Sequence, residues 1–110
     1  MLYAVIAHDG TDPGTFERRM QVRPAHMANG DRMLADGSFL FGGGILDGSG
    51  KMAGGVLIVD FETREEIDEW LRSEPYIVNK VWDRVEVHRL LVPPQFTGLF
   101  PKFQEQPTAG

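Results

Sequence analysis

Four stretches of this 110-residue chain carry the apolar pattern of β-strands. Each is rich in valine, isoleucine, leucine or phenylalanine and is bounded by turn-forming residues, as strands are. In the last stretch the valines at positions 85 and 87 alternate with polar residues, which is typical of a strand with one face in water. The predicted strands are residues 2–8, 38–46, 53–61 and 82–92.

The segment between the first two strands is predicted to be helical in two parts. A short helical piece precedes Pro24, which interrupts it, and the main helix spans residues 24–36. Gly37 is expected to end this helix in the left-handed conformation. Because Met27 and Leu34 lie seven residues apart, both are expected on the buried face of the helix.

A second helix is predicted after the third strand. Thr63 begins it, and Glu66 stands three residues later, as in a capping box. Apolar residues at the i, i+3 and i+4 spacing form its buried face. Residues 73–75 are expected to break this helix, and residues 76–81 to make one further turn before the last strand.

The order strand, helix, strand, strand, helix, strand predicts an α+β fold of the ferredoxin-like βαββαβ type, with both helices on one face of a four-stranded antiparallel sheet. The first and third strands carry apolar residues at successive positions, so both faces of the sheet are apolar. Since two helices cover only one face, we expect a second copy of the chain to bury the other and form a homodimer. Residues 1–92 are the predicted domain, and residues 93–110 an extension that packs on the partner subunit.

Composition narrows the class of protein. Hydrophobic residues make up 42% of the chain and charged residues 25%, as in an ordinary globular domain. A net charge of −5 argues against a nucleic-acid-binding protein, and the absence of cysteine excludes disulfides, thiolate nucleophiles and zinc–thiolate sites. No apolar run approaches the ~18 residues that span a membrane, and no basic region precedes the first strand as in a signal peptide. A cytoplasmic protein is expected.

His26 is the first candidate for chemistry. Because Pro24 is expected to begin a helix, His26 is predicted in its first turn, where the positive end of the helix dipole favours the neutral imidazole. A neutral histidine near Arg23 is a candidate general base. The alternative is a structural histidine that donates to a nearby backbone carbonyl, and the pattern alone favours that alternative.

Two charged residues are candidate partners of His26. Arg23 has a side chain that can clamp an anionic substrate, although a surface ion pair is the more ordinary role. Glu74 precedes Pro75, where a helical turn restarts, and its carboxylate could orient the imidazole. Its ordinary role is that of an exposed acid at a helix start.

Three consecutive glycines at positions 42–44 replace side chains within the second strand, so a ligand or another backbone is expected to approach there. Their spacing is not that of a phosphate-binding loop. A metal site is not expected, because His8 and His88 are predicted to lie ~20 Å apart along paired strands.

The chain resembles the YciI-like family of the dimeric α+β barrel superfamily. The resemblance is carried by LYAVIAHD in the first strand, VRPAHMA at residues 22–28, FLFGGGIL in the second strand and SEPYIVNKVWDRVEV at residues 73–87. It implies a ferredoxin-like homodimer, or a higher oligomer, with a pocket that holds a histidine–acid pair. By position the pair falls on His26 and Glu74, and the family usually has aspartate where this chain has glutamate.

The related proteins implied by this resemblance include muconolactone isomerase-like enzymes and a chlorinated-hydroquinone dehydrochlorinase. We therefore expect a lyase or isomerase that moves a proton on a small cyclic anionic substrate without a cofactor. His26 and Glu74 are the expected catalytic pair, and Arg23, Gly43 and Tyr76 the expected substrate-binding residues. The alternatives are a non-catalytic dimeric module that binds a metabolite or another protein, and a haem- or oxygen-using relative.

Overall fold

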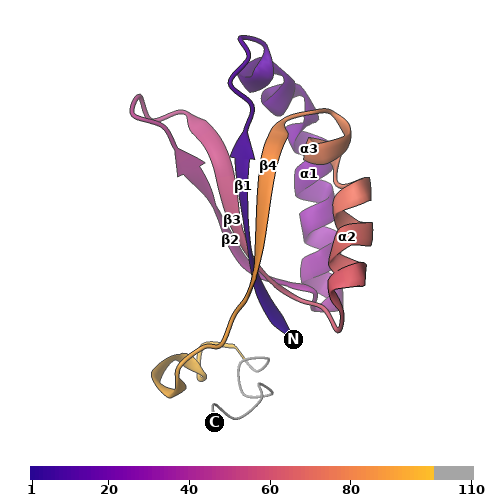
Figure 1. Cartoon of the computed structure of the whole chain (residues 1–110), viewed down its shortest axis with the longest axis vertical. Coiled ribbons are helices and arrows are strands. Elements are labelled where there is room, and N and C mark those ends of the chain that lie inside the picture. The colour runs from indigo at the N-terminus through magenta and orange to yellow at the C-terminus, as the bar shows by residue number, and fades with distance from the viewer. Residues whose placement is uncertain (101–110) are drawn as a thin grey trace.

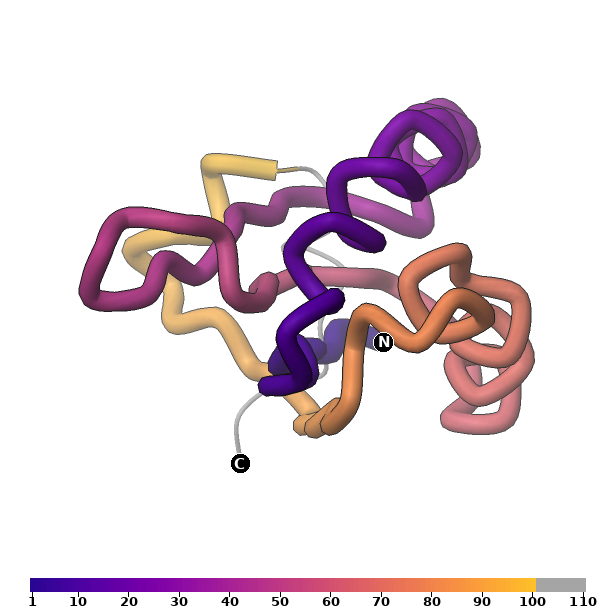
Figure 2. The backbone as a smooth tube through the Cα atoms, turned by 90° about the horizontal axis from the view of Figure 1, so that it is seen from above, coloured from indigo at the N-terminus to yellow at the C-terminus, as the bar shows by residue number. Residues whose placement is uncertain are grey.

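A computed structural model describes residues 1–100 of the chain and confirms the ferredoxin-like α+β fold. The four strands form one antiparallel sheet in the order β2-β3-β1-β4. The three α-helices described in residues 1–100 lie on one face of this sheet, as Figures 1 and 2 show. In chain order the elements are β1 (Leu2–Asp9), α1 (Thr15–Asp36), β2 (Phe39–Leu46), β3 (Met52–Asp60), α2 (Arg64–Ser73), α3 (Pro75–Val78), β4 (Trp82–Arg89) and the short 3₁₀ turn η1 (Pro94–Phe96).

The core fills the space between the sheet and the helices. Alternate residues of a strand point to the same face, so Tyr3, Val5 and Ala7 of β1 face the helices together with Leu57 and Val59 of β3. From the helices the buried hydrophobic side chains are Met33 of α1, Ile67 and Trp70 of α2 and Tyr76 of α3. This single cluster holds both layers together.

The prediction that Pro24 divides the first helix is wrong. Helix α1 runs without a break through Pro24, and His26 lies in its middle rather than in its first turn. The argument that a helix start keeps His26 neutral therefore does not apply. The first turns of α1 lie across the view in Figure 2 and its later turns are seen nearly end-on, so the helix bends along its length, as helices do where proline removes a hydrogen bond.

The predicted buried face of α1 is also wrong. Met27 is 46% and Leu34 51% exposed, whereas Met33 is buried. The inward stripe of α1 passes through Arg19, His26 and Met33 at seven-residue intervals, and Met27 and Leu34 each lie one position beside it.

The second helical region follows the prediction closely. The side chain of Thr63 accepts a hydrogen bond from the backbone N–H of Glu66 and caps α2. The break falls at Glu74, and the further turn, α3, ends earlier than expected at Val78. Strand β4 ends at Arg89, three residues before its predicted end, and Leu90 makes one further backbone hydrogen bond to the carbonyl of Leu2.

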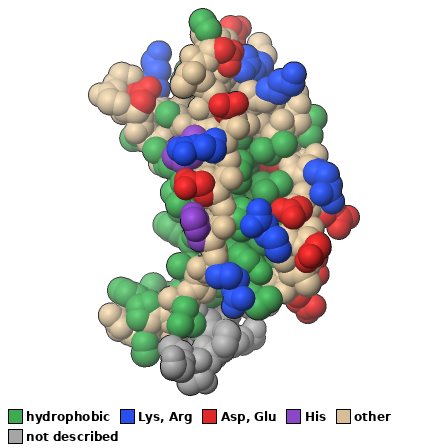
Figure 3. All heavy atoms as spheres, in the orientation of Figure 1, with side chains coloured by type: hydrophobic (Ala, Val, Ile, Leu, Met, Phe, Trp, Pro, Cys, Tyr) green, Lys and Arg blue, Asp and Glu red, His purple; other side chains and the backbone are tan. Residues whose placement is uncertain are grey.

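Within residues 1–100, no helix covers the second face of the sheet. Ala4 and Ile6 of β1 and Val56 and Ile58 of β3 point to this face and are only partly buried. Figure 3 shows hydrophobic side chains along this side of the molecule and in the arm that follows β4. In the predicted extension, Phe96 is exposed, and residues 101–110 lie outside the described residues.

Among residues 1–100, no helix combines the length and the apolar character required to cross a bilayer.

Replacing Ile67 by alanine tests the core. Ile67 is fully buried between α2 and the sheet, so Ile67→Ala should lower the free energy of unfolding by about 2–5 kcal/mol in urea denaturation. The matched control is Val78→Ala in α3, where the side chain is 60% exposed and a change within about 0.5 kcal/mol is expected. Equal losses for the two variants would contradict the assigned core.

Candidate active site

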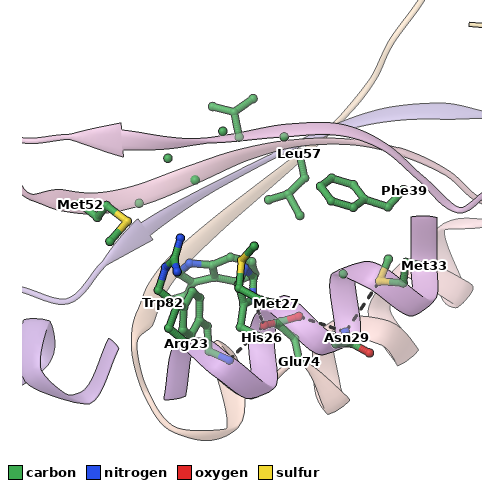
Figure 4. A pocket seen from close by; sticks show the side chains of 18 of the residues that line it. Arg23, His26, Met27, Asn29, Met33, Phe39, Met52, Leu57, Glu74 and Trp82 are labelled. Atoms are coloured by element: carbon green, nitrogen blue, oxygen red, sulfur yellow. Dashed lines mark hydrogen bonds and ion pairs between the residues drawn. The ribbon is translucent and has the colours of Figure 1, made fainter. Parts of the chain in front are cut away.

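A cavity of about 290 Å³ lies between α1 and the β2–β3 half of the sheet. Figure 4 shows Phe39, Met52 and Leu57 facing it from the sheet, and Met27 and His26 from the helix. Its volume is at the lower end for small-molecule sites, which suits a ligand of about one ring. Its charged and other polar side chains are those of Arg19, Arg23, His26, Asn29, Asp31, Glu74 and Tyr76.

His26 and Glu74 meet in this cavity, although 48 residues separate them in the chain. The Nδ1 atom of His26 lies 2.5 Å from Oε1 of Glu74. The Glu74 side chain is 2% exposed and that of His26 is 20% exposed, so the carboxylate is buried and the imidazole reaches the cavity. A short charge-assisted hydrogen bond in such surroundings fixes the direction of the imidazole.

Further hydrogen bonds hold the Glu74 carboxylate in place. Oε1 also accepts the backbone N–H of Tyr76 at 3.1 Å, which caps α3, and Oε2 accepts the amide of Asn29 at 3.3 Å. Arg32 donates to Oδ1 of Asn29 at 3.1 Å and so fixes the orientation of that amide. Glu74 is therefore a helix cap, as one reading of the sequence suggested, but a buried one that also reaches His26.

The hydrogen-bond pattern of His26 determines which nitrogen is free for chemistry. The Nδ1–H donates to the carboxylate, so Nε2 carries the lone pair in the neutral ring. Among the described residues Nε2 has no hydrogen-bond partner, and it is not a buried atom. This is the arrangement of a general base whose second nitrogen is oriented by an acid.

The His26 ring is also held by aromatic contacts. It stacks on Tyr76 with the ring centroids 3.9 Å apart and an angle of 10° between the planes. Trp82 stands nearly perpendicular to both rings, 5.5 Å from each centroid, and so lies beside the stack. No local sequence pattern predicts this stack, because its members come from α1, α3 and β4.

Arg19 and Asp9 form a buried ion pair behind the stack, and sequence reasoning missed it. The guanidinium donates to both carboxylate oxygens of Asp9, at 2.7 and 3.2 Å, and to the carbonyl of Gly54 at 3.1 Å. Its central carbon lies 4.7 Å from the centroid of the Tyr76 ring. Arg19 therefore connects β1, β3 and α3, and its charge is already neutralised.

Three residues were predicted to bind substrate, and the structure places all of them at the cavity. Arg23 is half-buried and forms no ion pair within residues 1–100, so its charge is available to a ligand. Gly43 contributes backbone only. Tyr76 is 1% exposed and lies under His26, so it offers little surface to a ligand. Burial raises the pKa of the Tyr76 hydroxyl, which therefore keeps its proton at neutral pH.

The other two histidines lie on the second face of the sheet. His8 and His88 are closer than predicted, because they lie on either side of Glu86, with Nε2–carboxylate distances of 3.1 and 3.9 Å. The hydrogen bond from His8 lowers the pKa of Glu86. In the part of the chain that the structure describes, no three histidine, aspartate or glutamate side chains are arranged to hold a metal ion.

Comparison of the sequence with known proteins identifies a matching domain family and several similar proteins. Residues 1–91 match the model of the YCII-related domain. The protein YciI of Escherichia coli is 32% identical over 93 residues, which cover 79% of this chain and 93% of YciI. The aspercryptin biosynthesis cluster protein B of Emericella nidulans is 31% identical over 78 residues, covering 64% of this chain and 50% of that protein.

Among solved structures, the chain is similar to the 5-chloro-2-hydroxyhydroquinone dehydrochlorinase TftG of Burkholderia phenoliruptrix, in complex with 2,5-dihydroxybenzoquinone. The TM-score is 0.72 and the sequence identity 23%, over 82% of this chain and 93% of TftG. This similarity shows that the two proteins share a fold.

Removing the carboxylate of Glu74 should destabilise the protein more than neutralising it. Glu74→Ala leaves the N–H groups of Tyr76, Asn29 and His26 without their acceptor, so we expect the free energy of unfolding to fall by at least about 2 kcal/mol. Glu74→Gln keeps one acceptor oxygen, so its free energy of unfolding should fall by less than that of Glu74→Ala. Urea denaturation measures both values, and an Ala variant as stable as the wild type would contradict the assigned contacts.

Proposed function

The chain belongs to the YCII-related domain family, and from this premise we propose that it is a cofactor-independent enzyme of the lyase or isomerase type. Its substrate would be a small cyclic anion, aromatic or lactone-like. The observation that carries the proposal is the free Nε2 of His26 at the cavity, with Nδ1 held by the buried Glu74.

The proposed reaction begins with proton abstraction by His26. Nε2 takes a proton from an acidic O–H or C–H group of the ring, and the electron pair of that bond moves into the ring. In an elimination, a leaving group on another ring carbon departs with its own bonding pair; in an isomerisation, the proton returns to a different atom. Neither route changes the oxidation state overall, so neither needs an oxidant.

Glu74 would stabilise the protonated, positively charged form of His26. When Nε2 accepts the proton, the imidazole becomes a cation directly beside the carboxylate, which stabilises it in a water-poor site. The stack on Tyr76 and the neighbouring Trp82 hold the ring in one orientation. Positioning of this kind keeps the base aligned with the proton it removes.

Arg23 would bind the negative charge of the substrate. Arg19 is already paired with Asp9, so of the two arginines at the cavity Arg23 has the uncompensated charge. A guanidinium recognises a carboxylate or a phenolate oxygen through parallel N–H groups. The remaining wall is largely apolar, which suits the ring itself.

The fold shared with TftG makes dehydrochlorination the reaction to test first. Loss of hydrogen chloride from a ring is an elimination in which a base removes the proton and chloride departs. A single histidine–carboxylate pair supplies the required base. Both the reaction and the substrate are proposals for this chain.

We further propose that the protein is a homodimer, in which the second faces of two sheets pack together. The partly buried apolar side chains of β1 and β3 on that face support this arrangement, because an uncovered apolar sheet face is unfavourable in water. The exposed apolar residues of the arm, Leu91, Phe96 and Leu99, would lie against the partner subunit.

Replacing His26 tests the proposed chemistry. We expect His26→Gln to reduce turnover by at least about 100-fold, because the general base is lost. The assay is chloride release from 5-chloro-2-hydroxyhydroquinone, with a panel of ring-bearing acids screened in parallel.

The matched control is His88→Gln, because His88 is exposed on the other face of the sheet and should not affect turnover. If the wild type binds ring acids but turns none of them over, and His26→Gln loses stability instead, the protein is a binding module rather than an enzyme.

A charge on the second face of the sheet should separate the subunits. Ile58 lies on this face in the central strand β3, so Ile58→Arg should convert a dimer to a monomer in sedimentation experiments. Val78→Arg changes an exposed position on the helical side and should leave the mass unchanged. A wild-type monomer would contradict the proposal.

A further inference from the structure

Five glycines of β2 and β3 line the cavity, and two of them are explained by packing. A Cβ atom on Gly42 would lie 2.7 Å from the Phe39 ring and 3.1 Å from the carbonyl oxygen of Val56. A Cβ atom on Gly54 would lie 2.3 Å from the carbonyl oxygen of Ala7. Real side chains do not fit at such distances, so both positions require glycine for the fold itself.

Gly44 and Gly55 have no such explanation. They face each other across the β2–β3 pair, and neither has a positive φ angle. A Cβ atom on Gly44 would meet Met52 at 3.7 Å, and one on Gly55 would meet the carbonyl oxygen of Gly43 at 3.6 Å and the Leu57 side chain at 3.7 Å. These are ordinary van der Waals contacts. Since glycine weakens a strand interior, its presence at both positions calls for another reason.

The missing side chains would point into the cavity. Met52, Leu57 and Trp82, which surround the two possible Cβ positions, all line it. Trp82 connects this part of the sheet to the proposed base, because one of its ring carbons, Cζ2, would lie 3.9 Å from a Cβ on Gly55 and its ring stands 5.5 Å from that of His26. Gly44 and Gly55 thus form a flat patch of backbone on the side of the cavity opposite α1, which we call the glycine floor.

We propose that the glycine floor binds the face of a flat, unsaturated ring, and that Gly44 and Gly55 thereby determine the substrate class. A planar ring can approach the peptide groups to van der Waals distance over its whole face. A puckered, saturated ring has axial hydrogens that prevent this approach, and a methyl group on the floor would prevent it too. The inference rests on the proposed function, because it names the substrate class of the same site.

Binding, rather than turnover, tests this inference. The probes are 2-hydroxybenzoate, which is flat, and 2-hydroxycyclohexanecarboxylate, its puckered counterpart, with dissociation constants measured by calorimetry. The wild type should bind the flat probe at least about tenfold more tightly. Gly44→Ala and Gly55→Ala should each weaken binding of the flat probe by about tenfold or more, because the added methyl displaces the ring.

The alanine variants should keep or raise the melting temperature, because alanine reduces the conformational freedom of the unfolded chain. Gly48→Ala is the matched control: a Cβ there meets nothing within 4 Å, and the residue lies outside the cavity, so affinity should not change. If one alanine variant fails to fold, the affinity of the other variant and the preference of the wild type for the flat probe still test the inference.

Three results would overturn the inference: unchanged affinity in the alanine variants, equal affinity of the wild type for the two probes, or no binding of the flat probe. These results differ from failure of the proposed function. If His26→Gln retains turnover while Gly55→Ala no longer binds the flat probe, the inference about the glycine floor is supported and the assigned base is wrong. If His26→Gln abolishes turnover and Gly55→Ala binds the flat probe as tightly as the wild type, the assigned base is supported and the inference about the glycine floor is wrong.

Discussion

The buried carboxylate of Glu74 is the constraint around which the site is arranged. A carboxylate removed from water is unfavourable unless every oxygen finds a donor. The donors come from the imidazole and the amide on α1 and from the backbone at the start of α3. Satisfying this one group therefore fixes the position of α1 relative to α3, and with it the direction in which His26 faces the cavity.

The two sides of the resulting cavity differ in polarity: the helical side carries most of the polar groups, and the sheet side is mostly apolar. The helical side carries the imidazole, its acid and the unpaired Arg23, whereas the sheet side presents methionine, leucine, phenylalanine and glycine. Arg19 also lines the cavity, but its charge is paired with Asp9 and its guanidinium packs against Tyr76. This division places charge only at the edge of an otherwise apolar cavity, where it orients a ligand without filling the space of the ring.

Much of the fold could be predicted from the sequence, because strand patterns, turn residues and the cap at Thr63 are local signals. The continuity of α1 could not, since proline interrupts helices in isolation and only packing along the whole stripe from Arg19 to Met33 outweighs that tendency. Because of this error, Met27 and Leu34 were predicted to lie in the core, whereas both line the wall of the cavity. The helical restart at Pro75 suggested Glu74 as a possible partner of His26, and the family resemblance paired the two residues, because no local pattern joins residues so far apart. The Arg19–Asp9 pair had no signal, because charged residues are ordinarily solvated.

The double role of Glu74 has a consequence for how sequences related to this one are interpreted. Its Oε1 atom both caps α3 and holds the imidazole, so a descendant that had lost catalysis would still be selected to keep an acid at this position for folding. The imidazole is one of the three donors to this carboxylate and stacks on Tyr76, but it caps no helix. A change at position 26 removes one of these contacts, whereas a change at position 74 removes all three, so loss of the proposed activity is expected to appear first at position 26.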